Sequence, residues 1–317
     1  MRPVLALIGV TAIVAALQAA TGSTLALGEI LSGDPRATAI LVELRLPRVA
    51  VGVAAGACLG VAGVILQAVL RNPLASPEVT GVGSGAVLGA VVATTAAASP
   101  AGLVLTAVIG GTVGGGVLWL VAARAGGDPR GLTVVGVLVS AVLAGAALII
   151  LTARPQLAGA MTRWLVGSLG GRTWEHWAAL WPFALVCVVA GTLLGPVLAV
   201  LAVDDDHARA VGLDPARWRP VVLIVAVVAT AAAVAAVGAL AFVGLLAPHL
   251  ARALGGPPVP VAALAGAATV ALADAVAQTV SGWAPAVGGT PPSLPAGVLT
   301  AVAGAIVMIR TAQGGAR

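Results

Sequence analysis

Long apolar runs separated by short polar stretches dominate this sequence. Breaking the runs at proline, glycine and charged residues leaves ten segments, and roughly 20 apolar residues are enough for a helix to cross a bilayer. The predicted spans cover residues 3–20, 47–70, 79–98, 101–123, 131–152, 178–201, 219–237, 239–254, 258–280 and 295–312. The pattern predicts an all-α, polytopic integral membrane bundle of about ten transmembrane helices, forming a single domain over residues 1–317.

Three polar stretches interrupt the apolar runs, and each is too short for a separate soluble domain. We expect residues 21–46 to form an outer loop and residues 203–218 a cytoplasmic loop. The remaining stretch, residues 153–177, contains Trp164, and three further tryptophans follow up to residue 181. Tryptophan favours the membrane–water interface, so we predict an interfacial helix over residues 160–172.

Arginine positions predict the orientation. Ten spans put both termini on one side, and with the N-terminus inside, the inner segments hold ten arginines and the outer segments six. The positive-inside rule therefore favours N-in and C-in. Residues 1–20 also resemble a signal peptide, but the run is long enough to span and no small-x-small cleavage site closes it. We expect it to be retained as the first helix.

Composition narrows the function classes. The chain is 60% hydrophobic and only 9% charged, and all 16 of its basic residues are arginine. Without lysine it holds neither a P-loop of the Gly-Lys-Ser/Thr type nor a Schiff base, so any ATP would be bound by another chain. The arginines are scattered singly, unlike a nucleic-acid footprint, and we expect no nucleic-acid partner. Recurring small-xxx-small spacings, as at Gly52, Gly56 and Gly60, predict tightly packed helices.

The polar residues offer few candidates for chemistry. Asp204–His207 is conceivable as a metal site, but adjacent carboxylates at a helix N-terminus are the simpler interpretation, and we predict no metal. His249 follows Pro248 within a span and could serve a pathway or only repair hydrogen bonding near a proline kink. Asp274 lies inside the ninth predicted span and needs a partner that the sequence does not identify. No arrangement typical of catalysis stands out, so we expect no enzyme activity from this chain alone.

Six ordered motifs resemble a known family. They are RLPR at 45–48, RNPLASP at 71–77, WLVGSL at 164–169, A-x-x-x-GL at 208–213, FVGL-x-x-PH at 242–249 and LPAGV at 294–298. In this order they resemble the FecCD-type permease subunits of ABC importers for ferric siderophores, haem and cobalamin. The resemblance implies a second permease subunit (a copy or a related chain), two cytoplasmic ATP-binding subunits and an extracytoplasmic binding protein. It also implies alternating access and a location in the inner or plasma membrane of a bacterium, with ATP and magnesium held by the partner and no cofactor on this chain.

The resemblance also implies roles for individual residues. Arg45 and Arg48 would dock carboxylates of the binding protein, although interfacial snorkelling is the alternative. Asn72 and Leu74 would lie near the inner gate, unless they only form a proline-rich turn. The 203–218 loop would insert a short helix into the ATPase subunit, through Asp205, Ala208, Arg209, Gly212 and Leu213.

Two details qualify these roles. Ala208 and Gly212 are four residues apart, so we expect them to share one smooth helix face for docking. Relatives often carry an arginine where this chain has Gln278, and a glutamate where it has Ser293, which puts those outer contacts in doubt.

The resemblance favours a ferric siderophore as substrate, with haem or cobalamin as the alternative within the family. An ion-coupled secondary transporter would need several intramembrane acidic residues, and only Asp274 is well inside a span. A membrane enzyme or a channel is not supported, because the sequence contains neither a catalytic cluster nor a selectivity filter.

Overall fold

The computed structural model describes residues 2–21, 34–78, 80–124, 129–154, 163–283 and 293–314, and within these ranges it contains helices and turns but no strand. The helices are α1 (Arg2–Ala20), α3 (Pro35–Ile40), the π-helix η1 (Leu41–Arg45), α4 (Leu46–Leu70), α5 (Val82–Thr95), α6 (Pro100–Arg124), α7 (Pro129–Ala153), α9 (Trp174–Leu193), α10 (Gly195–Leu201), α11 (Asp205–Ala210), α12 (Pro215–Val237), α13 (Val243–Leu254), α14 (Pro258–Trp283) and α15 (Ala296–Gly314). The predicted all-α fold is confirmed.

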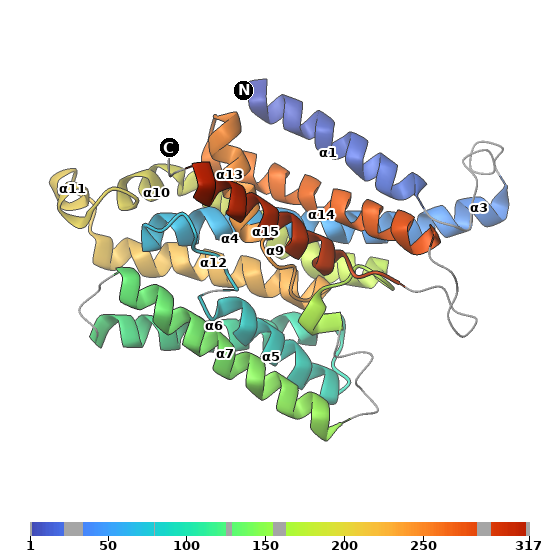
Figure 1. The fold of residues 1–317 in the computed structure, drawn as a ribbon, viewed down its shortest axis with the longest axis horizontal. Coiled ribbons are helices and arrows are strands. Elements are labelled where there is room, and N and C mark those ends of the chain that lie inside the picture. The colour runs from blue at the N-terminus through green and yellow to red at the C-terminus, as the bar shows by residue number, and fades with distance from the viewer. Residues whose placement is uncertain are drawn as a thin grey trace.

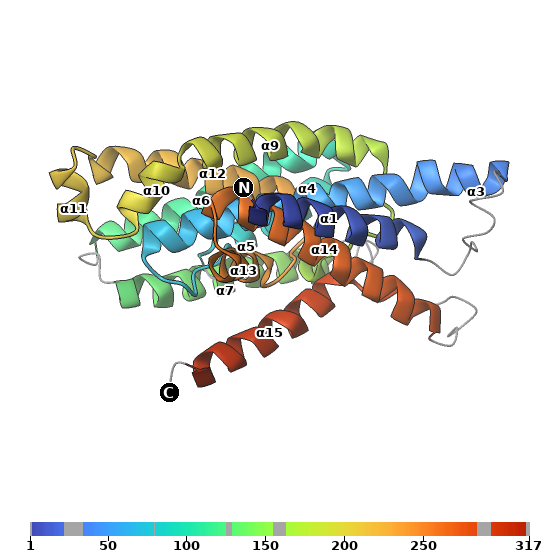
Figure 2. The same ribbon diagram turned by 90° about the horizontal axis from the view of Figure 1, so that it is seen from above.

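The long helices run roughly side by side, with α11 at one end of the molecule and α3 at the other (Figure 1). Helix α4 is central and packs against α9, α12, α13 and α14. Helices α5, α6 and α7 pack together on one side of it, whereas α1 packs on α14 on the other side. The N-terminal end of α1 and the C-terminal end of α15 both point toward the α11 end (Figure 2).

Seven helical segments among the described residues are long and apolar enough to cross a membrane. The predicted spans near residues 79–98, 239–254 and 295–312 correspond to the shorter apolar helices α5, α13 and α15. Helix α13 has 12 residues, about 18 Å at 1.5 Å per residue, which is well short of a hydrocarbon core of about 30 Å. The structure is thus a membrane bundle, and the count of ten crossings stays a prediction.

Helices α5 and α13 are short because each begins inside the bundle. Gly81 precedes α5 with φ +79°, and a Cβ there would lie 2.8 Å from the side chain of Val139. Phe242 precedes α13 with φ +65°, a left-handed conformation that is rare for a bulky residue. These two residues turn the chain sharply into the next helix, so the helices start at 82 and 243 rather than at 79 and 239.

Glycines bring several helix backbones into direct contact. A Cβ on Gly56 of α4 would lie 2.4 Å from the carbonyl oxygen of Gly266 in α14. A Cβ on Gly85 of α5 would lie 2.2 Å from the carbonyl oxygen of Gly110 in α6. Such distances exclude any side chain, and the tight packing predicted from the small-xxx-small spacings is confirmed.

Two further predicted boundaries differ from the structure. The outer loop 21–46 is helical from residue 35, because α3 and η1 continue directly into α4. The interfacial helix 160–172 lies partly outside the described residues, and its described part is helical only at 163–166. Gly167 and Gly171 follow with φ +78° and +71°, left-handed conformations that end a helix.

Candidate functional site

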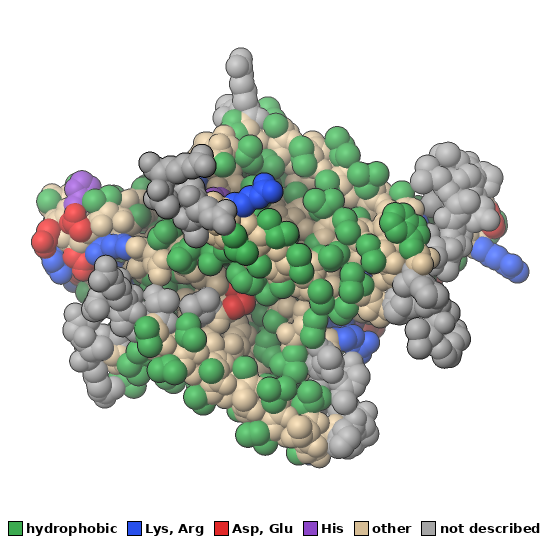
Figure 3. Space-filling view, in the orientation of Figure 1, with side chains coloured by type: hydrophobic (Ala, Val, Ile, Leu, Met, Phe, Trp, Pro, Cys, Tyr) green, Lys and Arg blue, Asp and Glu red, His purple; other side chains and the backbone are tan. Residues whose placement is uncertain are grey.

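On the face shown in Figure 3, charged side chains lie toward both ends, with a few between them, and hydrophobic side chains cover much of the rest. We call Gln18, Arg48, Asp274 and Gln278 the Asp274 cluster. We call Arg71, Asp205 and Arg219 the Asp205 cluster. Together the clusters contain three of the sequence-predicted site residues, namely Arg48, Asp205 and Asp274.

The Asp274 cluster joins three helices around one buried carboxylate. The Asp274 side chain is fully buried, and Arg48 donates to both of its oxygens, through Nε at 2.8 Å and Nη2 at 2.7 Å. Gln18 and Gln278 donate to Oδ2 at 2.7 and 2.9 Å. The partner that the sequence could not name is therefore Arg48, and the amide of Gln278 supplements it.

Arg45 lies one helical turn before Arg48 but points elsewhere. Its Nη1 donates to the carbonyl oxygens of Ala19 and Ala20, at 2.8 and 3.3 Å, and the residue is 8% exposed. The last carbonyls of a helix lack partners within it, and a cation there also suits the helix dipole. Both arginines of the RLPR motif thus make contacts within this chain, and docking of a binding protein stays a prediction.

The Asp205 cluster ties the short helix α11 to two long helices. Arg71, the C-cap of α4, forms an ion pair with Asp205 Oδ1, and Arg219 of α12 donates to both Asp205 oxygens, at 2.5 and 3.1 Å. Burial alone would raise the pKa of the Asp205 carboxyl. The hydrogen bonds and charges of the two arginines outweigh burial and hold that pKa below its usual range.

Helix α11 is defined at both ends by its own sequence. Asp204 is the N-cap, and its side chain accepts from the backbone N–H of His207 at 2.6 Å, which is the helix-terminus interpretation of the acidic run. At the other end, Leu213 N donates to Ala208 O at 2.8 Å and Gly212 N to Arg209 O at 3.0 Å. These two bonds form a Schellman motif with Gly212 at φ +83°.

The prediction that Ala208 and Gly212 share one smooth helix face is wrong. Ala208 is fully buried against this chain's own bundle. Gly212 lies beyond the end of α11, in the left-handed turn, with no atom within 4 Å of a Cβ built there. Glycine serves a backbone conformation at this position, and the exposed part of α11 presents Arg209 paired with Asp206 at 3.1 Å instead.

The candidate gate residues lie in the turn between α4 and α5. Asn72 Oδ1 accepts from the backbone N–H of Leu74 at 2.9 Å, and the Leu74 side chain is 51% exposed. These contacts define a compact Asx turn, while the exposed Leu74 is available to a neighbour. A gate role stays a prediction.

Pro248 and His249 lie in α13 beside this turn. Pro248 is buried in the contact with α4, where a Cβ on Gly63 would come within 2.9 Å of its ring. His249 Nδ1 lies 3.5 Å from Nη2 of Arg252, which also donates to Gln67 Oε1 at 2.6 Å. Gln67 in turn donates to the carbonyl oxygen of Ala75 at 3.4 Å. Arg252 therefore connects α13 through α4 to the turn that holds Asn72 and Leu74.

Several residues in these networks were missed as candidates. Arg71 lies in the RNPLASP motif, and its position directly after an apolar helix was a usable signal. Nothing in the sequence distinguishes Arg219, Arg252 or Gln67 from other polar residues, because their partners are distant along the chain. Arg172 is a further residue of this kind: it is buried and donates to the carbonyl oxygen of Ala236 at 2.8 Å.

Burial also lowers the pKa of the Arg172 guanidinium. Its guanidinium lies 5.6 Å from the ring centroid of Trp164, which in turn donates from Nε1 to Thr94 Oγ1 at 3.0 Å. Burial, with a smaller contribution from the charge of Arg163, lowers the pKa of Arg172 to about 10. The WLVGSL segment is thus packed inside the bundle rather than lying free at an interface.

Among the described residues no group of three or more His, Cys, Asp or Glu side chains is placed to hold a metal ion. The carboxylates of both clusters are committed to ion pairs between helices. Such ion pairs hold helices together, and the exposed ones can exchange partners when the helices move relative to one another.

A sequence model of the FecCD transport family matches residues 4–313. The chain belongs to the FecCD transport family. Members of this family are permease subunits of ABC transporters and not enzymes themselves, so this FecCD permease is a multi-pass membrane protein of an ABC importer.

Individual relatives cover most of the FecCD permease. The ferric enterobactin transport system permease protein FepG of Escherichia coli is 37% identical over 286 residues, covering 88% of this chain and 84% of the relative. The Fe(3+)-citrate import system permease protein YfmE of Bacillus subtilis is 33% identical over 272 residues, covering 84% and 79%. The cobalamin import system permease protein BtuC of Halobacterium salinarum is 34% identical over 281 residues, covering 86% and 73%.

The fold agrees with a solved structure. An ABC transporter of the metal-chelate type in an inward-facing conformation superposes with a TM-score of 0.83 at 25% identity, covering 98% of both chains.

Proposed function

We propose that this FecCD permease carries a ferric siderophore or a similar iron chelate across the inner membrane of a bacterium by alternating access. The ferric enterobactin and ferric citrate permeases among its relatives support this substrate class. A second permease subunit would complete the pathway, two cytoplasmic ATP-binding subunits would supply energy, and an extracytoplasmic binding protein would deliver the chelate.

The α11 end is the proposed cytoplasmic end. The observation that carries this assignment is the Asp205 cluster, in which one carboxylate links α11 to both α4 and α12. A displacement of α11 by an ATPase subunit would act directly on two membrane helices through these ion pairs. Arg209 is 63% exposed and Asp206 98% exposed, which leaves their pair available to such a subunit.

The Asp274 end is the proposed outer end. Arg48 keeps 26% of its side chain exposed while Asp274 is fully buried. A carboxylate of the binding protein would therefore approach the exposed edge of Arg48, while Asp274 holds the guanidinium from within. Arg45, buried on the end of α1, would support this edge without contacting the binding protein.

Uptake in a strain that lacks its own iron-chelate permease tests the substrate. We expect the complete transporter to restore radioactive iron uptake from at least one ferric siderophore and not from haem. Restored uptake of cobalamin with none of iron would overturn the iron assignment. Cobalamin is the alternative that the 34% identical BtuC supports.

Site-specific cross-linking tests the orientation independently of substrate. A cysteine at Arg209 should form cross-links to the ATP-binding subunit, whereas a cysteine at Arg36, near the opposite end, should not. Cross-linking from the Arg36 position alone would reverse the assignment of the two ends.

A further inference from the structure

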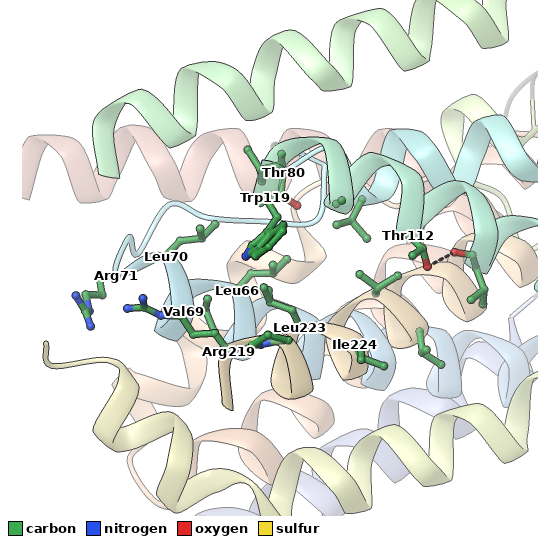
Figure 4. A pocket seen from close by; sticks show the side chains of 18 residues that line it. Leu66, Val69, Leu70, Arg71, Thr80, Thr112, Trp119, Arg219, Leu223 and Ile224 are labelled. Carbon is green, nitrogen blue, oxygen red and sulfur yellow. Dashed lines mark hydrogen bonds between the residues drawn. The ribbon is translucent and has the colours of Figure 1, made fainter. Parts of the chain in front are cut away.

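An apolar pocket of about 650 Å³ opens on the side of the bundle between α4, α6 and α12. Its volume is within the usual range of ligand pockets, about 300–1,000 Å³. Figure 4 shows Arg71 at one end, with Thr112 and Ile224 toward the other end. Apolar side chains line most of the length between them.

The mouth of the pocket lies on a surface that faces lipid in a membrane protein. Ile224 is 62% exposed and Trp119 is 57% exposed, and both line the pocket. On membrane-crossing helices, exposed apolar side chains suit contact with hydrocarbon wherever no second subunit covers them. The pocket therefore opens sideways, toward acyl chains.

Charge distinguishes one end of the pocket. Arg71 and Arg219 both line it, and Asp205 offsets only one of their two positive charges. In addition, Arg71 and Arg219 keep 28% and 30% of their side chains exposed. Their guanidiniums are therefore accessible to an oxygen acceptor at this end of the pocket.

We propose that this pocket binds an anionic phospholipid, with an acyl chain between α6 and α12 and the phosphate at Arg71 and Arg219. Basic pockets between membrane helices at the cytoplasmic side suit anionic head groups. The phosphate would share the two arginines with Asp205, which places the lipid directly beside α11. The site depends on this chain's own residues and not on the identity of the imported chelate.

Native mass spectrometry of the complete transporter, released from delipidated detergent micelles, measures this binding. The probes are phosphatidylglycerol, which is anionic, and phosphatidylcholine, which has no net charge. We expect one saturable phosphatidylglycerol per permease chain, and binding of phosphatidylcholine that is weaker by about ten-fold, because its choline cation opposes the attraction of its phosphate to the two arginines. Equal binding of the two lipids would overturn the proposal.

Two pairs of variants locate the site. Arg219→Gln should lower phosphatidylglycerol affinity about ten-fold, whereas Arg217→Gln, two residues away and 86% exposed outside the pocket, should not. Gly116 lines the pocket and a Cβ there meets no atom within 4 Å, so Gly116→Leu places a bulky apolar side chain in the pocket. Gly145→Leu on α7, where a Cβ is equally free, is its control.

The Gly116 pair keeps the proposal falsifiable if Arg219→Gln fails to assemble. Loss of the bound lipid in Gly116→Leu but not in Gly145→Leu supports the site. Unchanged phosphatidylglycerol binding in Gly116→Leu would overturn it, as would an equal loss in Gly145→Leu.

Discussion

The two aspartates that tie the membrane helices together are placed in opposite surroundings. The side chain of Asp274 is fully buried and receives one bidentate arginine and two glutamine amides. The side chain of Asp205 is 31% exposed, and its two arginines are exposed to a similar degree. The carboxylate of Asp274 is enclosed by its own chain while Arg48 stays partly exposed, and the carboxylate of Asp205 lies at a surface.

This difference sets what each ion pair can do. A buried charge cannot change partners without being left uncompensated, which is strongly unfavourable. A half-exposed carboxylate can exchange an arginine for water at little cost. The Asp274 cluster is therefore suited to fixing α1, α4 and α14 together, and the Asp205 cluster to adjusting during a transport cycle.

The largest effect is expected from removing Arg48. Arg48→Gln leaves the carboxylate of Asp274 buried without its cation, and we expect a loss of about 3–5 kcal/mol in the free energy of unfolding. Thermal unfolding of the purified permease in detergent measures the loss as a lowered Tm. A Tm close to that of the wild type would show that the pair is not structurally important.

A double variant separates structure from docking. Arg48→Met with Asp274→Leu removes both charges, and apolar replacement of a buried pair is often neutral for stability. We expect the Tm to recover while binding-protein-dependent uptake stays low. Full recovery of uptake would mean that Arg48 contributes only to stability.

A smaller effect is expected at the exposed cluster. Asp205→Asn weakens two half-exposed pairs, each of which contributes up to about 1 kcal/mol, so we expect a loss of about 1–2 kcal/mol. Transport per ATP hydrolysed should fall more than stability does, since α11 loses its charged links to α4 and α12. Asp206→Asn is the matched control for stability, because its pair with Arg209 is exposed and does not link α11 to α4 or α12.

The pH dependence of this effect follows from the lowered pKa of Asp205. Its contribution is present above the unfolded-state pKa, about 3.9, and is lost as the pH falls through the lower folded-state value. The Tm difference between the wild type and Asp205→Asn should thus be constant from pH 5 to 8 and vanish at lower pH. A difference that changes near pH 6 would implicate another group.

The smallest effect is expected at Gly212. Its φ of +83° is unfavourable for alanine by about 1 kcal/mol, whereas asparagine tolerates this conformation better. Gly212→Ala should lower coupling slightly and Gly212→Asn less. Because a Cβ at this position meets nothing in this chain, equal and severe loss in both variants would instead indicate a close contact with the ATPase subunit.

Local features could be predicted from the sequence, and long-range pairings could not. Asp204 as a helix cap follows from a rule that acts over a few residues. The partner of Asp274 lies 226 residues away, and no local pattern indicates it. Ala208 and Gly212 show the limit within one loop: their spacing suggested a shared face, but a left-handed turn after Ala210 separates them.

Helix α4 carries an arginine of each cluster near its two ends. Arg48 and Arg71 are separated by about 35 Å at 1.5 Å per residue, along a single unbroken α-helix. A hydrogen-bonded helix tilts, turns or shifts far more easily than it stretches. Helix α4 is therefore expected to move as a rigid body, so that a displacement at one cluster shifts the other while the distance between them is preserved.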